Sequence, residues 1–165
     1  MKTLTPKELE TIFENKELYL YHFNEESKTA LGEFIASHPP YDNSLEEELE
    51  NTHAFGFPIV RITMPIHPTQ SKFYDSFLDH MTREWLPLGQ TQKKQHLMRY
   101  YLKNINAEVL VVDNIERIFK EPTMIRLNLL ESIELIRVKV GIPVVLCSEN
   151  QDILDYLIQE EQTHL

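Results

Sequence analysis

The sequence predicts one α/β domain built on a parallel sheet with helices on both faces. Four apolar, β-prone segments alternate with segments of helical periodicity, which is the pattern of βαβ units. A chain of 165 residues is long enough to bury a core within a single domain. Its composition, 42% apolar and 25% charged, is globular, and no repeat or low-complexity linker divides it. We expect one domain over residues 1–165, with an N-terminal helix in 1–17 and a core in 18–160.

The N-terminal half is expected to hold two helices and two strands. Thr5, Pro6 and Glu8 fit the N-cap, the first helical position and the acidic first turn of a short helix that ends near Asn15. After it, β-prone and helical spacings alternate. They predict a strand at Leu18–Phe23, a helix at Ser27–Ser37, a solvated acidic loop or short helix at Tyr41–Gly56 and a strand at Phe57–Thr63.

The C-terminal half continues the alternation. Apolar residues recur at helical spacing in four segments and form continuous runs in two others. These patterns predict helices at Ser71–Thr82, Gln92–Asn104, Thr123–Val140 and Gln151–Glu160, and strands at Val109–Val112 and Ile142–Cys147. Gly141 is expected to cap the end of the third helix, and Asn150 the start of the fourth. We interpret the methionine and aromatic residues on the helix faces as core, not as a cofactor site.

Composition excludes several classes of function. A formal charge of −10 argues against nonspecific affinity for nucleic acid, because phosphate binding depends on Lys and Arg. Cys147 is the single cysteine, which indicates a buried thiol in a reduced intracellular protein. The seven histidines show no metal-binding pair, and four glycines leave no dinucleotide-binding fingerprint. Without an 18-residue apolar stretch or a signal peptide, we expect a soluble, cytoplasmic protein with no membrane contact.

Two short segments combine into a degenerate nucleotide-site pattern. The run Val109–Val112 ends on Asp113, as strands that present an acid to magnesium do, but Asn114 follows where a second acid is usual. Lys28 and Thr29 begin a helix after the first strand, as in the phosphate loop G-x-x-x-x-G-K-[ST]. Both glycines of that loop are missing. His22 stands at the first glycine position and Ser27 at the second.

Three segments resemble the AAA+ ATPases of DNA transposition of the TniB/TnsC type. SKTALGEFIASHPP is similar to the Gly-Lys-Thr helix of that family, and FPIVRITMPIHPTQSKFYDSFLDHM to its second strand, proline-rich loop and Phe-Tyr helix. AEVLVVDNIERIF followed by GIPVVLCSEN resembles its Walker B and sensor strands. The resemblance covers about Leu18 to Leu157. It implies a three-layer fold of the P-loop NTPase type, an AAA+ core with strand order 1-4-3-2 that lacks the fifth strand and the helical lid.

The departures from this family argue against ATP hydrolysis. Ser27 adds a Cβ where the loop requires glycine, and Glu25 and Glu26 bring negative charge toward the phosphates, so nucleotide binding should weaken on the order of 10²-fold or more. An amide at Asn114 cannot accept a proton from water, and loss of a positioned base lowers rates by about 10²–10⁴-fold. The sensor-like positions are Ser148 and Glu149. We expect no cofactor, with at most weak ATP and Mg²⁺ binding, the ion held doubtfully by Asp113.

Three functional readings remain open at this point. The first is a non-hydrolysing regulatory component that binds transposition proteins or a full-length AAA+ relative. The second is a weak ATP-binding regulator of target-DNA selection that uses Lys28, Thr29 and Asp113. The third is a decayed mobile-element remnant without a selected role. DNA contact is possible but indirect, and by position the candidates are Arg61, Lys72 and Arg83, for which solvent-exposed solubilising charges are the simpler interpretation.

Two spatial expectations follow from the resemblance. Lys28 should begin a helix within reach of the Asp113 carboxylate. The strand at Leu18–Phe23 should form a sheet edge with no charge or proline to protect it. We expect this edge to be covered by residues 1–15, by a second copy of the chain, or by a partner.

Overall fold

The computed structural model describes the chain in several separate ranges. These are positions 5, 7–8, 10–11, 18–22, 29–30, 33, 59–81, 90–150, 152–153, 155–156 and 159. They include all four strands and the helices that pack on them. No helix among these residues is both long enough and apolar enough to cross a membrane.

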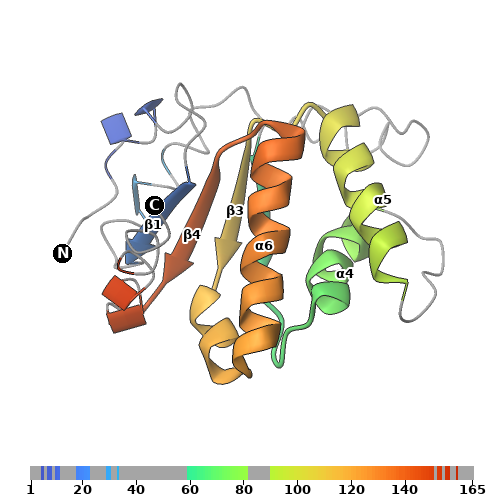
Figure 1. Ribbon diagram of the computed structural model, residues 1–165. Coiled ribbons are helices and arrows are strands. Elements are labelled where there is room, and N and C mark those ends of the chain that lie inside the picture. Colours follow the sequence, from blue (N-terminus) through green and yellow to red (C-terminus); the bar gives the residue numbers. More distant parts are fainter. Residues whose placement is uncertain are drawn as a thin grey trace.

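The four described strands form one parallel sheet. They are β1 (Leu18–His22), β2 (Ile59–Thr63), β3 (Val109–Asp113) and β4 (Val144–Ser148). Their order is β1-β4-β3-β2, which is the order that the resemblance implies, and all three pairings are parallel. The predicted α/β class is therefore confirmed. Figure 1 shows β4 between β1 and β3, with the arrows of β3 and β4 pointing toward the same end of the sheet.

The central strands are buried on both faces, which explains their continuous apolar sequences. Leu110 and Val112 of β3, with Val144 and Leu146 of β4, join the main hydrophobic core. Val111 of β3 points to the opposite face and is also buried. A strand buried on both faces cannot show the alternation of a half-exposed strand, so continuous apolar runs were the correct signal.

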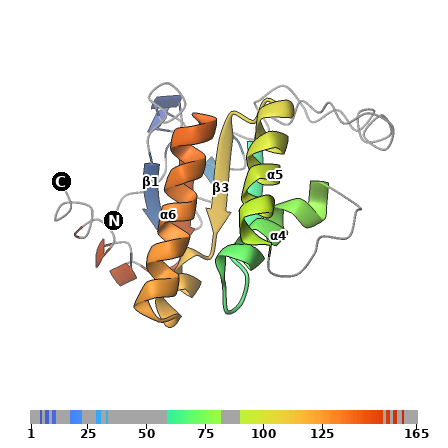
Figure 2. The same cartoon turned by 45° about the vertical axis from the view of Figure 1, so that its right-hand side comes forward.

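Three helices cover one face of the sheet. They are α4 (Gln70–Met81), α5 (Thr91–Asn104) and α6 (Thr123–Val140), with a short 3₁₀ helix, η1 (Ile115–Lys120), between β3 and α6. Figures 1 and 2 show α6 lying along the sheet with α5 beside it and α4 packed against α5. Phe73, Phe77, Met98, Leu129 and Ile133 carry the helical side of the core.

The predicted helix caps are present. Thr5 and Glu8 form a reciprocal capping box, in which Glu8 N donates to Thr5 Oγ1 and Thr5 N donates to Glu8 Oε2. Gly141 has φ 75°, and its N–H donates to Arg137 O at 3.0 Å. Such a left-handed residue ends the helix because glycine lacks the Cβ that makes this conformation unfavourable. Asn150 Oδ1 accepts from Asp152 N at 3.0 Å.

Several predicted boundaries were wrong by one or two residues. Strand β4 begins at Val144, two residues later than expected, and it includes Ser148, which was expected to follow the strand. Pro143 has no N–H for the ladder, but its carbonyl accepts from Leu110 N at 3.0 Å. The 3₁₀ helix η1 was not predicted. Helices α4 and α5 each start one residue earlier than their periodicity indicated.

Candidate site at the carboxyl ends of the strands

The carboxyl ends of the four strands bring together most of the predicted site residues that the structure describes. In the parallel register, Thr63 of β2 lies opposite Asp113 of β3, and His22 of β1 lies opposite Ser148 of β4. The described residues here line a hollow of about 210 Å³. Small-molecule sites usually measure about 300–1,000 Å³, and the part of this site that the described residues line is smaller. Its lining consists of Arg61, Thr63, Asp113, Asn114, Cys147, Ser148 and Glu149.

An ion pair between Arg61 and Asp113 dominates this site. Arg61 Nε donates to Asp113 Oδ2 at 2.5 Å, and the two side chains are 43% and 16% exposed. The geometry follows from the sheet, because Arg61 lies two residues before the end of β2 and its neighbour β3 ends on Asp113. Arg61 was interpreted as an exposed solubilising charge. Its side chain is exposed, as that interpretation expects, but its guanidinium also neutralises the acid that the sequence singles out.

Asn114 occupies a special backbone conformation at the start of η1. Its φ of 56° and ψ of 42° lie in the left-handed region, which asparagine tolerates better than most residues. Its carbonyl accepts from Arg117 N at 3.1 Å, and its side chain makes no capping hydrogen bond. An uncharged amide therefore stands next to Asp113 in the position where the resemblance would place a catalytic glutamate.

Cys147 of β4 is a neighbour of Asp113 that cannot act as a nucleophile at neutral pH. Burial, with a smaller contribution from the negative charge of Asp113, raises the pKa of its thiol from 9.0 to about 12. The next residue, Ser148, is also buried, and its Oγ accepts from Asn150 N at 3.0 Å. Glu149 is exposed beyond it. Of the two sensor-like residues, Ser148 is thus used to form the turn after β4.

The raised pKa of Cys147 leads to a prediction about alkylation. In the folded protein at pH 8, iodoacetamide should not label this thiol, whereas labelling in urea should be rapid because the unfolded thiol titrates near 8.5. The protonated thiol contributes its full stabilisation below the unfolded pKa, and this contribution is lost as the pH rises toward about 12. Mass spectrometry of alkylated protein, with and without urea, measures the effect. Equal labelling rates in both states would contradict it.

The loop between β2 and α4 is fastened to this same end of the sheet. Met64 N donates to Asp113 O at 2.9 Å, and Arg117 Nη1 donates to Met64 O. His67 Nδ1 lies 3.2 Å from Glu121 Oε1. Lys72, a predicted DNA-contact candidate, donates from Nζ to His67 O at 3.2 Å. Its ammonium thus helps to hold the loop.

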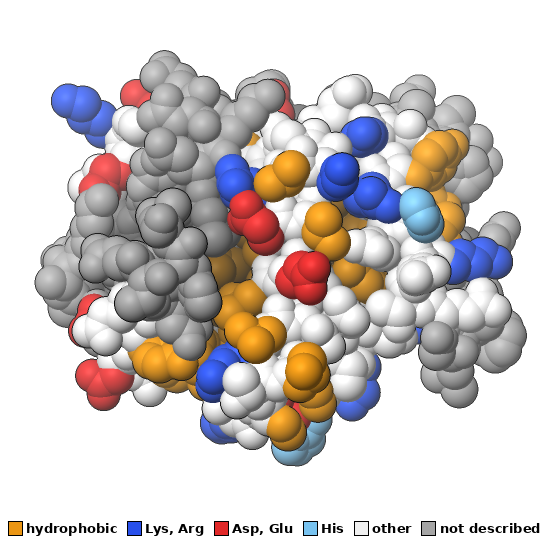
Figure 3. All heavy atoms as spheres, in the orientation of Figure 1, with side chains coloured by type: hydrophobic (Ala, Val, Ile, Leu, Met, Phe, Trp, Pro, Cys, Tyr) orange, Lys and Arg blue, Asp and Glu red, His pale blue; other side chains and the backbone are white. Residues whose placement is uncertain are grey.

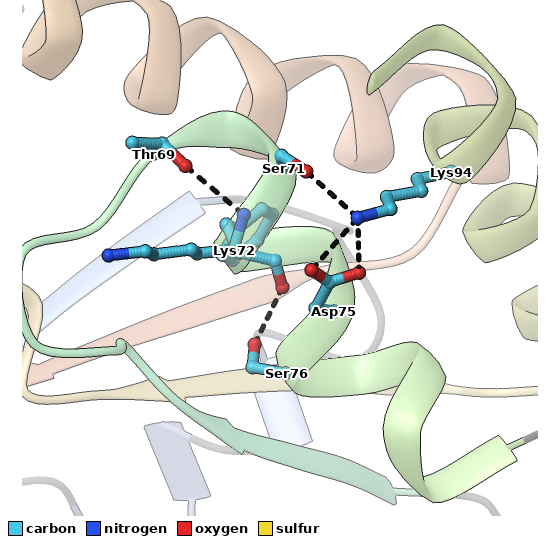
Figure 4. Close-up of polar contacts among 7 residues, drawn as sticks. Thr69, Ser71, Lys72, Asp75, Ser76 and Lys94 are labelled. Atoms are coloured by element: carbon cyan, nitrogen blue, oxygen red, sulfur yellow. Dashed lines mark hydrogen bonds and ion pairs between the residues drawn. The ribbon is translucent and has the colours of Figure 1, made fainter. Parts of the chain in front are cut away.

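A buried lysine on α5 was not predicted. Lys94 is 2% exposed, and its ammonium lies 2.9 Å from Ser71 Oγ and 2.9 and 2.8 Å from the two Asp75 carboxylate oxygens (Figure 4). These contacts join the first turn of α5 to α4. The apolar stripe on α5 could have pointed to Lys94, because it lies four residues before Met98 on the same helix face.

Other predicted site residues are only partly described. Thr29 lies in a helix and its side chain is exposed, and His22 ends β1. Ser27, Lys28 and Arg83 lie outside the described residues, so the proximity of Lys28 to Asp113 stays a prediction. Strand β1 pairs only with β4 among the described strands, and coverage of its other edge stays a prediction as well.

The comparison with protein families shows to which family the chain belongs. The family described as "TniB: Bacterial TniB protein" matches residues 25–164, most of the chain and all of the segments that carry the resemblance. The chain belongs to the TniB family. A search of curated proteins finds no match. Within this TniB chain the match includes β2, α4, β3 and β4, and hence the site around Asp113.

A TniB fold of the AAA+ type implies a Mg²⁺ ion near Asp113, but the described residues do not fit one. Mg²⁺ requires a nearly octahedral set of oxygen ligands. Here Asp113 Oδ2 binds a guanidinium and Ser148 Oγ accepts from a turn N–H, while Asp113 Oδ1 is buried with no N–H or O–H donor among the described residues. No group of three His, Cys, Asp or Glu in the described ranges could hold a metal ion. A divalent ion bound here would have to share the Asp113 carboxylate with the guanidinium of Arg61.

The surface of this TniB chain carries its positive charge unevenly. Helix α5 contains Lys93, Lys94, Arg99 and Lys103 and no acidic residue, although the whole chain has a formal charge of −10. Figure 3 shows basic side chains gathered over the upper part of α5 and the adjoining α6. Tyr100 is 60% exposed on the same helix. Lys94 is buried, so the basic surface of α5 is formed by Lys93, Arg99 and Lys103.

Proposed function

We propose that this TniB-family protein acts in DNA transposition as a binding and regulatory component that does not hydrolyse ATP. The observation that carries the proposal is the pair Asp113–Asn114 at the end of β3. Asp113 keeps the position of a metal-binding acid, but the next residue is an amide in a left-handed conformation. An amide cannot remove a proton from an attacking water molecule, so the chemical step lacks its base.

The surroundings of this pair support the same proposal. The Asp113 carboxylate is engaged by the Arg61 guanidinium. The thiol nearest to it is protonated at neutral pH because burial raises the pKa of Cys147 to about 12. Neither Asn114 nor Cys147 can therefore act as the base or nucleophile of a phosphoryl transfer at this strand end.

The partners that fit such a role are other transposition proteins or a full-length AAA+ relative. A chain that keeps the family fold without the chemistry can still present the surfaces by which such subunits associate. We infer an indirect relation to DNA and possible self-association through the β1 edge, in the cytoplasm. An unpaired apolar strand edge is a surface on which another chain can add a strand.

One observation favours a second candidate, a regulator that binds ATP weakly. Asp113 Oδ1 is buried with no N–H or O–H donor among the described residues, and such an atom is normally satisfied by a ligand, water or ion. Lys28 and Thr29 would supply the phosphate contacts. The two candidates differ in whether the protein binds nucleotide. A remnant without a selected role would bind neither nucleotide nor a partner protein.

ATP turnover by the purified protein should not exceed background. Restoring the base with Asn114→Glu should not rescue it, because the phosphate loop lacks both glycines and ATP must bind before it reacts. A phosphate-release assay on the wild type and Asn114→Glu, with and without DNA, measures this. Turnover typical of ring ATPases that disappears in Lys28→Ala would contradict the proposal.

Fluorescent-nucleotide titration separates the two binding candidates. Saturable binding that is lost in Lys28→Ala would support the weak ATP-binding regulator. Absence of nucleotide binding, together with a change in the ATPase rate of a full-length TniB relative on mixing, would support the proposed binding component.

A further inference from the structure

Arg61 provides a permanent positive charge where an AAA+ site would use a metal ion. Its Nε donates to Asp113 Oδ2 at 2.5 Å, and a guanidinium is a cation well suited to pairing with a carboxylate. We propose that Arg61 replaces the divalent cation at the end of β3, so that this site neither requires nor binds Mg²⁺. The inference concerns the same strand end as the proposed function, but it depends on the ion pair and not on the loss of hydrolysis.

The sheet itself places the two residues together. Arg61 and Thr63 lie on the same face of β2, and in the parallel register they face Val111 and Asp113 of β3. A side chain as long as arginine spans this two-residue offset. An arginine at this single position on the adjacent strand is therefore enough to bring a cation to Asp113.

The remaining donors do not compensate for the oxygen that Arg61 occupies. Asp113 Oδ1 offers a single oxygen ligand, and Ser148 Oγ is engaged in the turn after β4. Mg²⁺ keeps its water shell unless several oxygens replace it, and a neighbouring guanidinium repels it. A charge-assisted hydrogen bond to arginine satisfies the carboxylate without a bound ion.

Mn²⁺ provides a direct probe, because it binds oxygen ligands like Mg²⁺ and broadens nearby NMR signals. In ¹⁵N-labelled wild type we expect no saturable broadening at the amides of Asp113 and Asn114. Arg61→Gln should show saturable broadening that Mg²⁺ reverses, with Mn²⁺ affinity raised on the order of tenfold or more. Arg61→Lys keeps the charge and should behave as the wild type does. Lys72→Gln removes a cation from the neighbouring loop and should also leave the spectra unchanged.

Two results would overturn the inference. One is Mg²⁺-reversible Mn²⁺ binding to the wild type that Asp113→Asn abolishes. The other is a folded Arg61→Gln that gains no binding. If Arg61→Gln does not fold, the wild-type and Arg61→Lys titrations still decide the matter. ATP turnover by the wild type would contradict the proposed function, whereas Mn²⁺ binding without turnover would contradict this inference alone.

Discussion

Replacing Asp75 with alanine is expected to lower the free energy of unfolding by about 3–5 kcal/mol, the usual effect of leaving a buried charge without its partner. Lys94 is 2% exposed, and Asp75 provides the only carboxylate that its ammonium contacts in the described structure. Lys94 also lies in the first turn of α5, where the helix dipole disfavours a cation. Without Asp75 the ammonium keeps only Ser71 as a partner.

The reverse substitution should be less damaging. Lys94→Met leaves the Asp75 carboxylate, which is 29% exposed and can turn to water, so we expect a loss of about 1–3 kcal/mol. The double variant Asp75→Leu with Lys94→Met should recover part of the stability, because apolar residues can replace a buried pair. Urea unfolding followed by circular dichroism measures all of these.

Asp79 supplies the matched control for Asp75. It lies one turn further along α4 and is exposed, so Asp79→Ala should change stability by less than about 0.5 kcal/mol. An Asp75→Ala variant as stable as Asp79→Ala would show that the Lys94 contacts contribute little. The order Asp75→Ala, then Lys94→Met, then Asp79→Ala is the result that supports a buried ion pair between α4 and α5.

Phe73→Ala is the second substitution expected to have a large effect, at about 3–5 kcal/mol of unfolding free energy. Phe73 is fully buried in the main core, and its ring lies 5.6 Å from that of Tyr74. Removing the ring leaves a cavity between α4 and its neighbours that the surrounding helices cannot fill without moving. The measurement is the unfolding midpoint in urea together with its slope.

Two variants calibrate this second prediction. Phe73→Leu keeps most of the volume and should lose clearly less stability than Phe73→Ala. Tyr100→Ala removes an aromatic ring that is 60% exposed on α5 and should change stability by less than about 1 kcal/mol. If Phe73→Ala and Tyr100→Ala were equally stable, α4 would not be anchored by its aromatic face.

Local sequence patterns were sufficient for the four strands, for helices α4 to α6 and for the family, but not for η1. Continuous apolar runs predicted β3 and β4, since strands buried on both faces need no polar side. Helical periodicity placed α6 at Thr123–Val140, and Gly141 marked its end. These features depend on residues within a few positions of each other. The segments that resemble TniB proteins are likewise contiguous, and the family match covers them.

The tertiary structure decided which charges meet. Arg61 and Asp113 are 52 residues apart in sequence, and Lys94 and Asp75 are 19 apart. Their pairing depends on strand register and on the packing of α4 against α5, neither of which a single sequence states. Charged side chains are usually exposed, so the general expectation for both Arg61 and Lys94 is exposure to solvent. Helix packing buried Lys94, whereas Arg61 stays exposed and strand register brings its guanidinium to Asp113. The chemical character of the Asp113 site is therefore decided by the tertiary structure.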